Sequence, residues 1–251
     1  MTLPSERKAL LFSAGGVRMA LRLSHVREIL PAAGGAEVGA RGDTPNAAFV
    51  AAVLGLPAGP APFAIVTEGG ALRVEALHGI VDLAQAEVFQ LPARTPLPDP
   101  APFGGAVVVK GEISLELAVP ALGFAPLLPA TDPGEPPPDL GGVERELRFA
   151  RGGRTFGVPL ALLVQVLEAP TVALVPLAPP SHRGLLYHGR AIHPVLDVAV
   201  LYGAPPGEAP RHVLLVDAGG TGAGVVADRI LGLGEGGDDV LRPPWDALFQ
   251  T

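Results

Sequence analysis

The chain has 251 residues, a net charge of −7 and no cysteine. The negative charge argues against nucleic-acid binding, which needs a basic surface, and the lack of cysteine excludes disulfides, thiolate nucleophiles and cysteine metal ligands. Hydrophobic residues make up 48% of the chain, which is enough for a core, and the length suits two domains. Glycine and proline, about a quarter of the residues, separate short runs of valine, leucine and isoleucine, a pattern typical of many short strands joined by turns.

The first predicted element is a β-hairpin within residues 9–30, ALLFSAGGVRMALRLSHVREIL. Its Gly-Gly pair lies between two apolar runs, where both turn residues must reach positive φ. A short helical turn is expected next, with Val26 and Ile29 facing inward and Arg27 and Glu28 facing outward. The preceding N-terminal residues lack a long apolar segment with a cleavage signal, so we expect no secretory peptide and a cytoplasmic protein.

Residues 44–67 carry no charge and are long enough to span a membrane. Pro57, Pro60 and Pro62 interrupt this segment, however, and three prolines in six residues break a helix. We therefore expect two buried elements joined by a turn and no membrane insertion.

The opening pattern returns later in the chain. Residues 146–167, ELRFARGGRTFGVPLALLVQVL, align with residues 9–30 without a gap, and residues 200–227 parallel residues 53–77. These echoes predict a tandem duplication. The expected organisation is a divergent first domain at residues 7–126, a stiff linker rich in proline and acidic residues at 127–145, and a second domain at 146–251.

The two copies differ at their ends. The first copy closes with another predicted hairpin at residues 106–123, AVVVKGEISLELAVPALG, and the second copy shows no counterpart before residue 251. We expect that the second copy lacks its final strands, or that the first copy, the linker or a second chain supplies them. A homo-oligomer that completes the second copy is therefore one expected assembly.

The second copy resembles the CheW-like domain of bacterial chemosensory systems over residues 147–235. The motifs follow in order: F-x-x-G-G with an aromatic residue, a glycine and a proline after it, then V-P-x-A-P, P-V-x-D and V-x-D-R. The first copy keeps the opening hairpin, Val26 to Ile29, Arg41-Gly42 and the closing strands, but it lacks the P-V-x-D motif.

This resemblance implies an all-β fold, in which each domain consists of two small SH3-like barrels of roughly five strands with short helical turns. It also implies a non-enzymatic adaptor that couples methyl-accepting chemoreceptors to a CheA-type histidine kinase, whose regulatory domain is homologous, with no cofactor and no metal. A divergent scaffold that binds the kinase but no receptor is the main alternative. The residues expected to contact partners are Val26, Glu28, Arg41, Gln165, His188, Arg190, Asp197 and Asp228.

Two other interpretations compete with the adaptor. A metallohydrolase would use His188 and His193, which lie near Asp197. On a strand, however, His193 and Asp197 would be roughly 13 Å apart, too far to bind one metal ion, so we interpret the region as a strand–turn–strand with Asp197 accepting hydrogen bonds from a loop. Residues 222–227, Gly-Ala-Gly-Val-Val-Ala, mimic a dinucleotide-binding loop, but Val225 and Val226 favour a strand, and the glycine cluster favours a hairpin turn.

Overall fold

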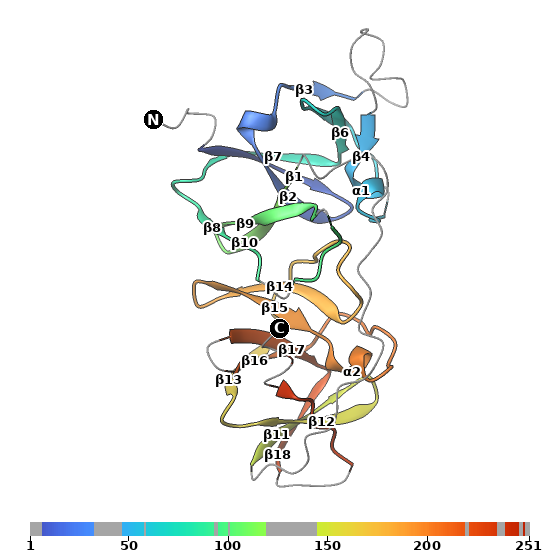
Figure 1. Ribbon diagram of the computed structural model, residues 1–251, viewed down its shortest axis with the longest axis vertical. Helices are drawn as coiled ribbons and strands as arrows, with labels where there is room; N and C mark the ends of the chain where they lie inside the picture. The colour runs from blue at the N-terminus through green and yellow to red at the C-terminus, as the bar shows by residue number, and fades with distance from the viewer. Residues whose placement is uncertain are drawn as a thin grey trace. The chain divides into compact units, whose positions relative to one another are not determined.

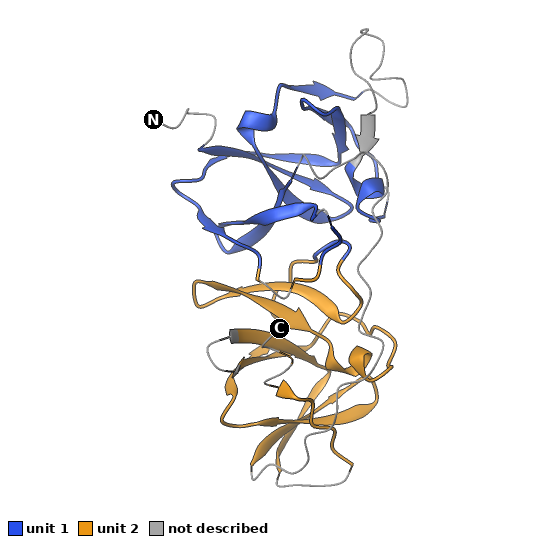
Figure 2. Cartoon of the chain, in the orientation of Figure 1, with its two compact units in different colours: residues 1–91, 97–130, 175–177 blue, residues 92–96, 131–174, 178–251 orange. Residues whose placement is uncertain are grey.

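The computed structural model describes residues 7–32, 47–57, 59–92, 95–99, 101–118, 145–218, 221–234, 239–245 and 248. These residues form short strands in four sheets, with short helical turns at η1 (Leu23–His25), α1 (Val50–Val53) and α2 (Val198–Leu201) (Figure 1). The all-β fold class is confirmed. The chain divides into two compact units, each with two of the sheets: unit 1 comprises residues 1–91, 97–130 and 175–177, and unit 2 comprises residues 92–96, 131–174 and 178–251 (Figure 2).

The larger sheet of unit 1 begins with the predicted hairpin. Gly15 and Gly16 join its strands with φ angles of 58° and 75°, a backbone conformation that favours glycine. Six strands follow the order β7-β1-β2-β10-β9-β8: β7 (Ala76–Asp82), β1 (Lys8–Ala14), β2 (Val17–Arg22), β10 (Glu112–Leu117), β9 (Phe103–Val109) and β8 (Glu87–Phe89). The hairpin predicted near residues 106–123 is thus formed by β9 and β10, and β10 lies parallel to β2.

The smaller sheet of unit 1 corrects one prediction. Its strands follow the order β3 (Glu28–Pro31), β5 (Phe63–Val66), β6 (Ala71–Val74) and β4 (Ala47–Phe49). The segment from Val26 to Ile29 is therefore not a helical turn, because β3 begins at Glu28 and pairs with β5. Ile29, expected to face inward, is exposed, because β3 is an edge strand of this sheet.

Unit 2 contains a three-stranded and a five-stranded sheet. The first has the order β12 (Arg154–Pro159), β11 (Glu146–Arg151) and β18 (Arg229–Gly234). The second has the order β13 (Leu163–Glu168), β16 (His212–Ala218), β17 (Thr221–Ala227), β15 (Ala191–Leu196) and β14 (His182–His188). The glycine-rich segment lies in the β16–β17 hairpin, as interpreted from the sequence. Only this sheet has the expected five strands among the described residues.

Unit 2 buries two apolar clusters, because the strands of its five-stranded sheet are covered on both faces. On β16, Val213 and Leu215 belong to one cluster, whereas Leu214 and Val216 belong to the other. The second cluster also receives Phe149 and Phe156 from the three-stranded sheet, whose rings stack at 5.6 Å. Alternate residues of one strand therefore face different cores, as the two-residue period of a strand requires.

The strand pairing in the two units has the same register. Phe12 pairs with Met19 in unit 1, and Phe149 pairs with Phe156 in unit 2. These residues correspond in the alignment of 9–30 with 146–167. Because one register shift would turn every side chain to the opposite face, matching registers at aligned positions are what a duplication predicts.

A C-terminal segment takes the place of the missing hairpin strand beside β12. In unit 1, Leu115 of β10 lies opposite Met19 in parallel orientation, and in unit 2 Leu241 lies opposite Phe156, also in parallel. The Gly157 amide donates to the Leu241 carbonyl and the Leu241 amide donates to the Thr155 carbonyl, both at 2.9 Å. The segment that follows β18 therefore lies against this edge of β12 at Leu241.

Several sequence predictions fall outside the described residues: Arg41, residues 127–144 of the linker, and residues 44–46 and 58 of the uncharged segment 44–67. Among the residues that the structure describes, no helix is long and apolar enough to cross a membrane.

Candidate partner-binding site

The histidine-containing stretch forms a hairpin, which confirms the strand–turn–strand interpretation. Strands β14 and β15 pair in antiparallel orientation, with His188 opposite Ala191. Gly189 and Arg190 form the turn, with φ angles of 59° and 62°. Two consecutive residues with positive φ fit a tight two-residue hairpin, so the side chain of Arg190 is held exposed at its tip.

Two predicted site residues of the five-stranded sheet, His188 and Gln165, contact each other through their side chains. His188 Nε2, on β14, lies 3.0 Å from Gln165 Oε1, on β13. Ala173, which follows β13 in the chain, forms a bridge with Leu185 of β14. His188, at the end of β14, thus contacts the side chain of Gln165, although β13 and β14 do not pair with each other.

His193 is tied to backbone oxygens. Its Nε2 lies 3.3 Å from the carbonyl oxygen of His188, and its Nδ1 lies 3.4 Å from that of Gly222. Within the described residues, no group of three or more histidine, aspartate or glutamate side chains could hold a metal ion. Around His188 and His193, the described residues thus provide no cluster of metal ligands of the kind that a metallohydrolase needs.

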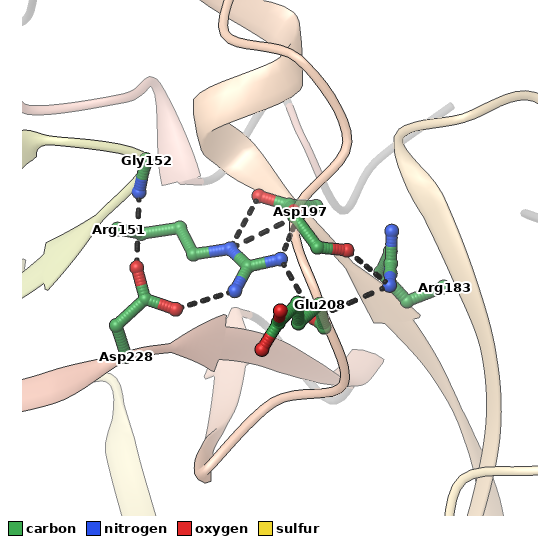
Figure 3. A network of polar contacts seen from close by, with 7 residues as sticks. Arg151, Gly152, Arg183, Asp197, Glu208 and Asp228 are labelled. Atoms are coloured by element: carbon green, nitrogen blue, oxygen red, sulfur yellow. Dashed lines mark hydrogen bonds and ion pairs between the residues drawn. The ribbon is translucent and has the colours of Figure 1, made fainter.

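Two other predicted residues, Asp197 and Asp228, meet at a buried arginine (Figure 3). Arg151 ends β11 and is 2% exposed. Its Nε and Nη2 donate to Asp197 Oδ2 at 3.0 and 2.5 Å, and its Nη1 donates to Asp228 Oδ1 at 2.5 Å. Asp228 Oδ2 also accepts the Gly152 amide at 3.1 Å, which fixes the β11–β12 turn.

The charges in this network compensate one another. Burial alone would lower the pKa of the Arg151 guanidinium, but the hydrogen bonds and charges of Asp197 and Asp228 outweigh burial and raise it. Arg183, beside the network, donates to the Gly207 carbonyl at 2.8 Å (Figure 3). Arg151 therefore stays charged and joins the three-stranded sheet to the chain that leaves the five-stranded one.

Burial changes the interpretation of Asp197. Its side chain is fully buried and paired, so it offers no surface for direct contact with a partner. The expectation that it accepts hydrogen bonds from a loop is replaced by an ion pair with a side chain. Asp228 differs, because about half of its side chain remains exposed beside the β11–β12 turn.

Sequence reasoning missed two features of unit 2. Arg151 follows Leu147 and Phe149 at the inward positions of strand β11, a signal that could have predicted a buried ion pair. Val164 is 65% exposed and Val166 is 38% exposed on β13, on either side of Gln165. Their exposure depends on the edge position of β13, which the apolar pattern alone does not reveal.

The predicted residues of unit 1 lie on the equivalent strand. Val26 is half-buried after η1, and Glu28 is exposed at the start of β3. Between them, Arg27 forms an exposed ion pair with Glu68 at 3.3 Å. The structure thus places Val26 and Glu28 together, and places Gln165 on the matching strand of unit 2.

Comparison with known proteins now defines the class of unit 2. The model of the CheW-like domain family matches residues 146–249. Among solved structures, the scaffolding protein TtCheW from Thermoanaerobacter tengcongensis is similar, with 16% identity, a TM-score of 0.38 and coverage of 43% of this chain and 93% of that chain. No curated protein matches the chain.

Residues 146–249 are therefore a CheW-like domain, as the sequence resemblance predicted. Its boundaries enclose β11 to β18 and the segment beside β12. The Arg151 network and the exposed strand β13 both lie within it.

Proposed function

We propose that this chain is a cytoplasmic, non-enzymatic adaptor of a chemosensory pathway that binds the regulatory domain of a CheA-type histidine kinase and a methyl-accepting chemoreceptor. The observation that carries the proposal is the match of residues 146–249 to the CheW-like domain. The resemblance of the P-V-x-D and V-x-D-R motifs to that family supports it further.

The surface proposed to bind the kinase is the exposed edge strand β13. Val164 and Val166 provide apolar area, and the exposed residues Gln165 and Glu168 surround it with polar groups. Among the described strands, β13 pairs only with β16, so one edge of its backbone is open. An apolar centre with a polar rim, and an open strand edge, are features of protein-binding surfaces. His188 and Arg190 extend this surface from the neighbouring hairpin.

Unit 1 is proposed to be a second, diverged CheW-like domain with a weaker version of this surface. Arg27, directly before the matching strand β3, aligns with Val164 of unit 2, and Glu28, at the start of β3, aligns with Gln165. The pair of Arg27 with Glu68 makes this face more polar. We therefore assign kinase binding mainly to unit 2, and receptor binding remains with either unit.

The test is a binding titration of the full chain against the kinase from the same organism. Val164→Asp places a charge in the centre of the proposed surface and should weaken binding at least about tenfold, because desolvating an unpaired charge opposes association. Val88→Asp is the matched control, since Val88 is also an exposed valine on a strand, but on β8 of unit 1. Equal losses in both variants, or no kinase binding by the unaltered chain, would contradict the proposal.

A parallel titration with a soluble receptor fragment separates the adaptor from the alternative scaffold. Binding of both partners supports the coupling role. Binding of the kinase alone supports the scaffold without receptors.

A further inference from the structure

The same edge is closed in both units, but by different chain segments. In unit 1, β10 of the closing hairpin lies beside β2, with Leu115 opposite Met19 and Glu116 opposite Ala20. In unit 2, Leu241 lies opposite Phe156 in parallel orientation. The next residue on each segment, Arg242 and Gly157, therefore corresponds to Glu116 and Ala20 of unit 1. Arg242 thus stands at the position that Glu116 has in unit 1.

Unit 1 holds its closing strand by arginines on β2 and glutamates on β10. Arg18 pairs with Glu112, and Arg22 pairs with Glu116. A second contact joins Arg22 Nη2 to Glu116 Oε2 at 3.3 Å. The glutamates are therefore on the strand that arrives, and the arginines are on the sheet that receives it.

Unit 2 reverses these signs. Glu146, on β11, is fully buried and accepts two hydrogen bonds from the Arg242 guanidinium, from Nε at 2.9 Å and from Nη2 at 3.1 Å. The carboxylate reaches Arg242 by crossing Gly157, where an added Cβ would lie 2.2 Å from Glu146 Oε2. Arg148 of the same strand also donates to Glu146 at 3.1 Å, but the partner that crosses the edge, Arg242, belongs to the arriving segment.

The two charges occupy equivalent cross-strand pairs. Ala9 pairs with Arg22 in unit 1, and Glu146 pairs with Pro159 in unit 2, at aligned positions. The pair therefore contains a cation in unit 1 and an anion in unit 2. Beside Arg242, the Trp245 side chain is buried and donates its indole N–H to the Gly157 carbonyl at 3.1 Å, which fastens the arriving segment further.

We propose that these opposite charges act as a recognition code that keeps each closing strand in its own unit. If a β10 strand, from this chain or from a second copy, entered the edge of β12, Glu116 would face the buried carboxylate of Glu146. Two carboxylates at one buried position repel each other. If residues 240–245 entered the edge of β2, Arg242 would face Arg22. Each receiving edge therefore selects its own strand and rejects the other, which suppresses strand exchange between two homologous sheets.

The first experiment measures which edge accepts a β10 strand. A dye-labelled peptide of residues 103–117 is titrated by fluorescence anisotropy against the full chain, Glu146→Arg and Arg242→Glu. Both substitutions break the pair that holds residues 240–245, but only Glu146→Arg offers a cation to Glu116. The peptide should bind Glu146→Arg at least tenfold more tightly than the other two chains, and a Glu116→Arg peptide should lose this preference.

Equal binding of the peptide to both single variants would overturn the proposal, because the released edge would then take the strand regardless of charge. Absence of binding to a folded Glu146→Arg chain would overturn it as well.

The second experiment restores the pair with reversed signs, and if a single variant fails to fold, the readout is whether the double variant folds. In the double variant Glu146→Arg with Arg242→Glu the pair is restored with reversed signs. Its urea midpoint for unit 2 should recover more than half of what the single variants lose. The double variant should also bind the native peptide of residues 103–117 at least tenfold more weakly than Glu146→Arg does. A midpoint loss equal to the sum of the two single losses would show that no charge code exists.

Discussion

The two units place opposite kinds of chemistry on similar backbones. Where unit 2 has Arg151 and Asp197, the aligned positions of unit 1 are Ala14, at the end of β1, and Phe49, which precedes α1. Unit 1 therefore joins its sheets without charge at this position, whereas unit 2 uses a buried ion pair. A buried ion pair adds little net stability but makes the loss of either partner costly, so the two units should respond very differently to similar substitutions.

A second position shows the same contrast. In unit 1, Ala9 and Ala20 belong to an apolar cluster between β1, β2 and β9. In unit 2, the aligned residues are Glu146 and Gly157, and the glycine leaves room for the carboxylate. Similar pairing registers thus tolerate an apolar cluster in one unit and an ionic contact in the other, provided that every buried charge has a partner.

The largest expected effect comes from breaking the ion pair on one side. Asp197→Ala should lower the free energy of unfolding of unit 2 by about 3–5 kcal/mol, because it leaves Arg151 buried without its main partner. Urea unfolding of the full chain, followed by two probes, measures this as an earlier transition of unit 2. The double variant Arg151→Met with Asp197→Leu imitates the apolar solution of unit 1 and should recover most of the loss. A double variant that is no more stable than Asp197→Ala would contradict the comparison.

Acid should also distinguish the units. His182 is buried, neither of its ring nitrogens has a hydrogen-bond partner among the described residues, and burial lowers its pKa from 6.5 to about 4. Between these values the unfolded chain binds the proton more readily than the folded one, so the stability of unit 2 is complete above pH 6.5 and falls as pH drops toward 4. The total loss should be about 3 kcal/mol.

The measurement for His182 is a series of urea unfolding curves between pH 7 and pH 4. His182→Leu should remove the part of the pH dependence that falls in this window. His78→Gln, a substitution at an exposed histidine of unit 1, is the control and should leave it in place. If the dependence of stability on pH is unchanged in His182→Leu, this dependence arises from other titratable groups.

A smaller effect is expected where Glu146 crosses the β12 backbone. Gly157→Ala should destabilise unit 2 by about 1–3 kcal/mol, because the new methyl group displaces the carboxylate from Arg242. Gly104→Ala, where nothing lies within 4 Å of the added Cβ, should change the stability of unit 1 far less. Thermal melts of both variants provide the comparison. Equal shifts in melting temperature would argue against the passage of the Glu146 side chain over Gly157.

The smallest effect belongs to the exposed pair of unit 1. Arg27→Ala should change stability by less than about 1 kcal/mol, because Arg27 and Glu68 are both largely exposed to solvent. The same thermal melts at low and high salt measure it. A loss as large as that of Asp197→Ala would mean that exposed and buried pairs do not differ here.

Local patterns in the sequence predicted the parts of the fold that depend on neighbouring residues. The Gly15-Gly16 hairpin, the strand–turn–strand around Gly189 and the hairpin of β16 and β17 all follow from turn residues between apolar runs. The resemblance of the second copy to the CheW-like domain is confirmed for residues 146–249. The first copy as a domain of the same family, and the partner contacts, remain predictions.

Features that depend on distant residues were not predicted. The spacing of Val26 and Ile29 suits one face of a helical turn, but pairing with β5 makes their segment a strand. The parallel contact of Leu241 with Phe156 joins segments that carry no common period. The ion pair of Arg151 with Asp197 also depends on tertiary structure. The sequence motif therefore indicated Asp197 as a site residue but did not predict that it is buried.

The Arg151 network has a consequence for how unit 2 unfolds. It ties the end of β11, in the three-stranded sheet, to Asp197, directly after β15 of the five-stranded sheet. Opening either sheet alone would separate Arg151 from Asp197 and leave one of these charges buried without its partner. The two sheets should therefore open as a single cooperative unit. Unit 1 has the uncharged residues Ala14 and Phe49 at these positions, which cannot form an ion pair, so we expect its sheets to exchange their amide hydrogens at separate rates.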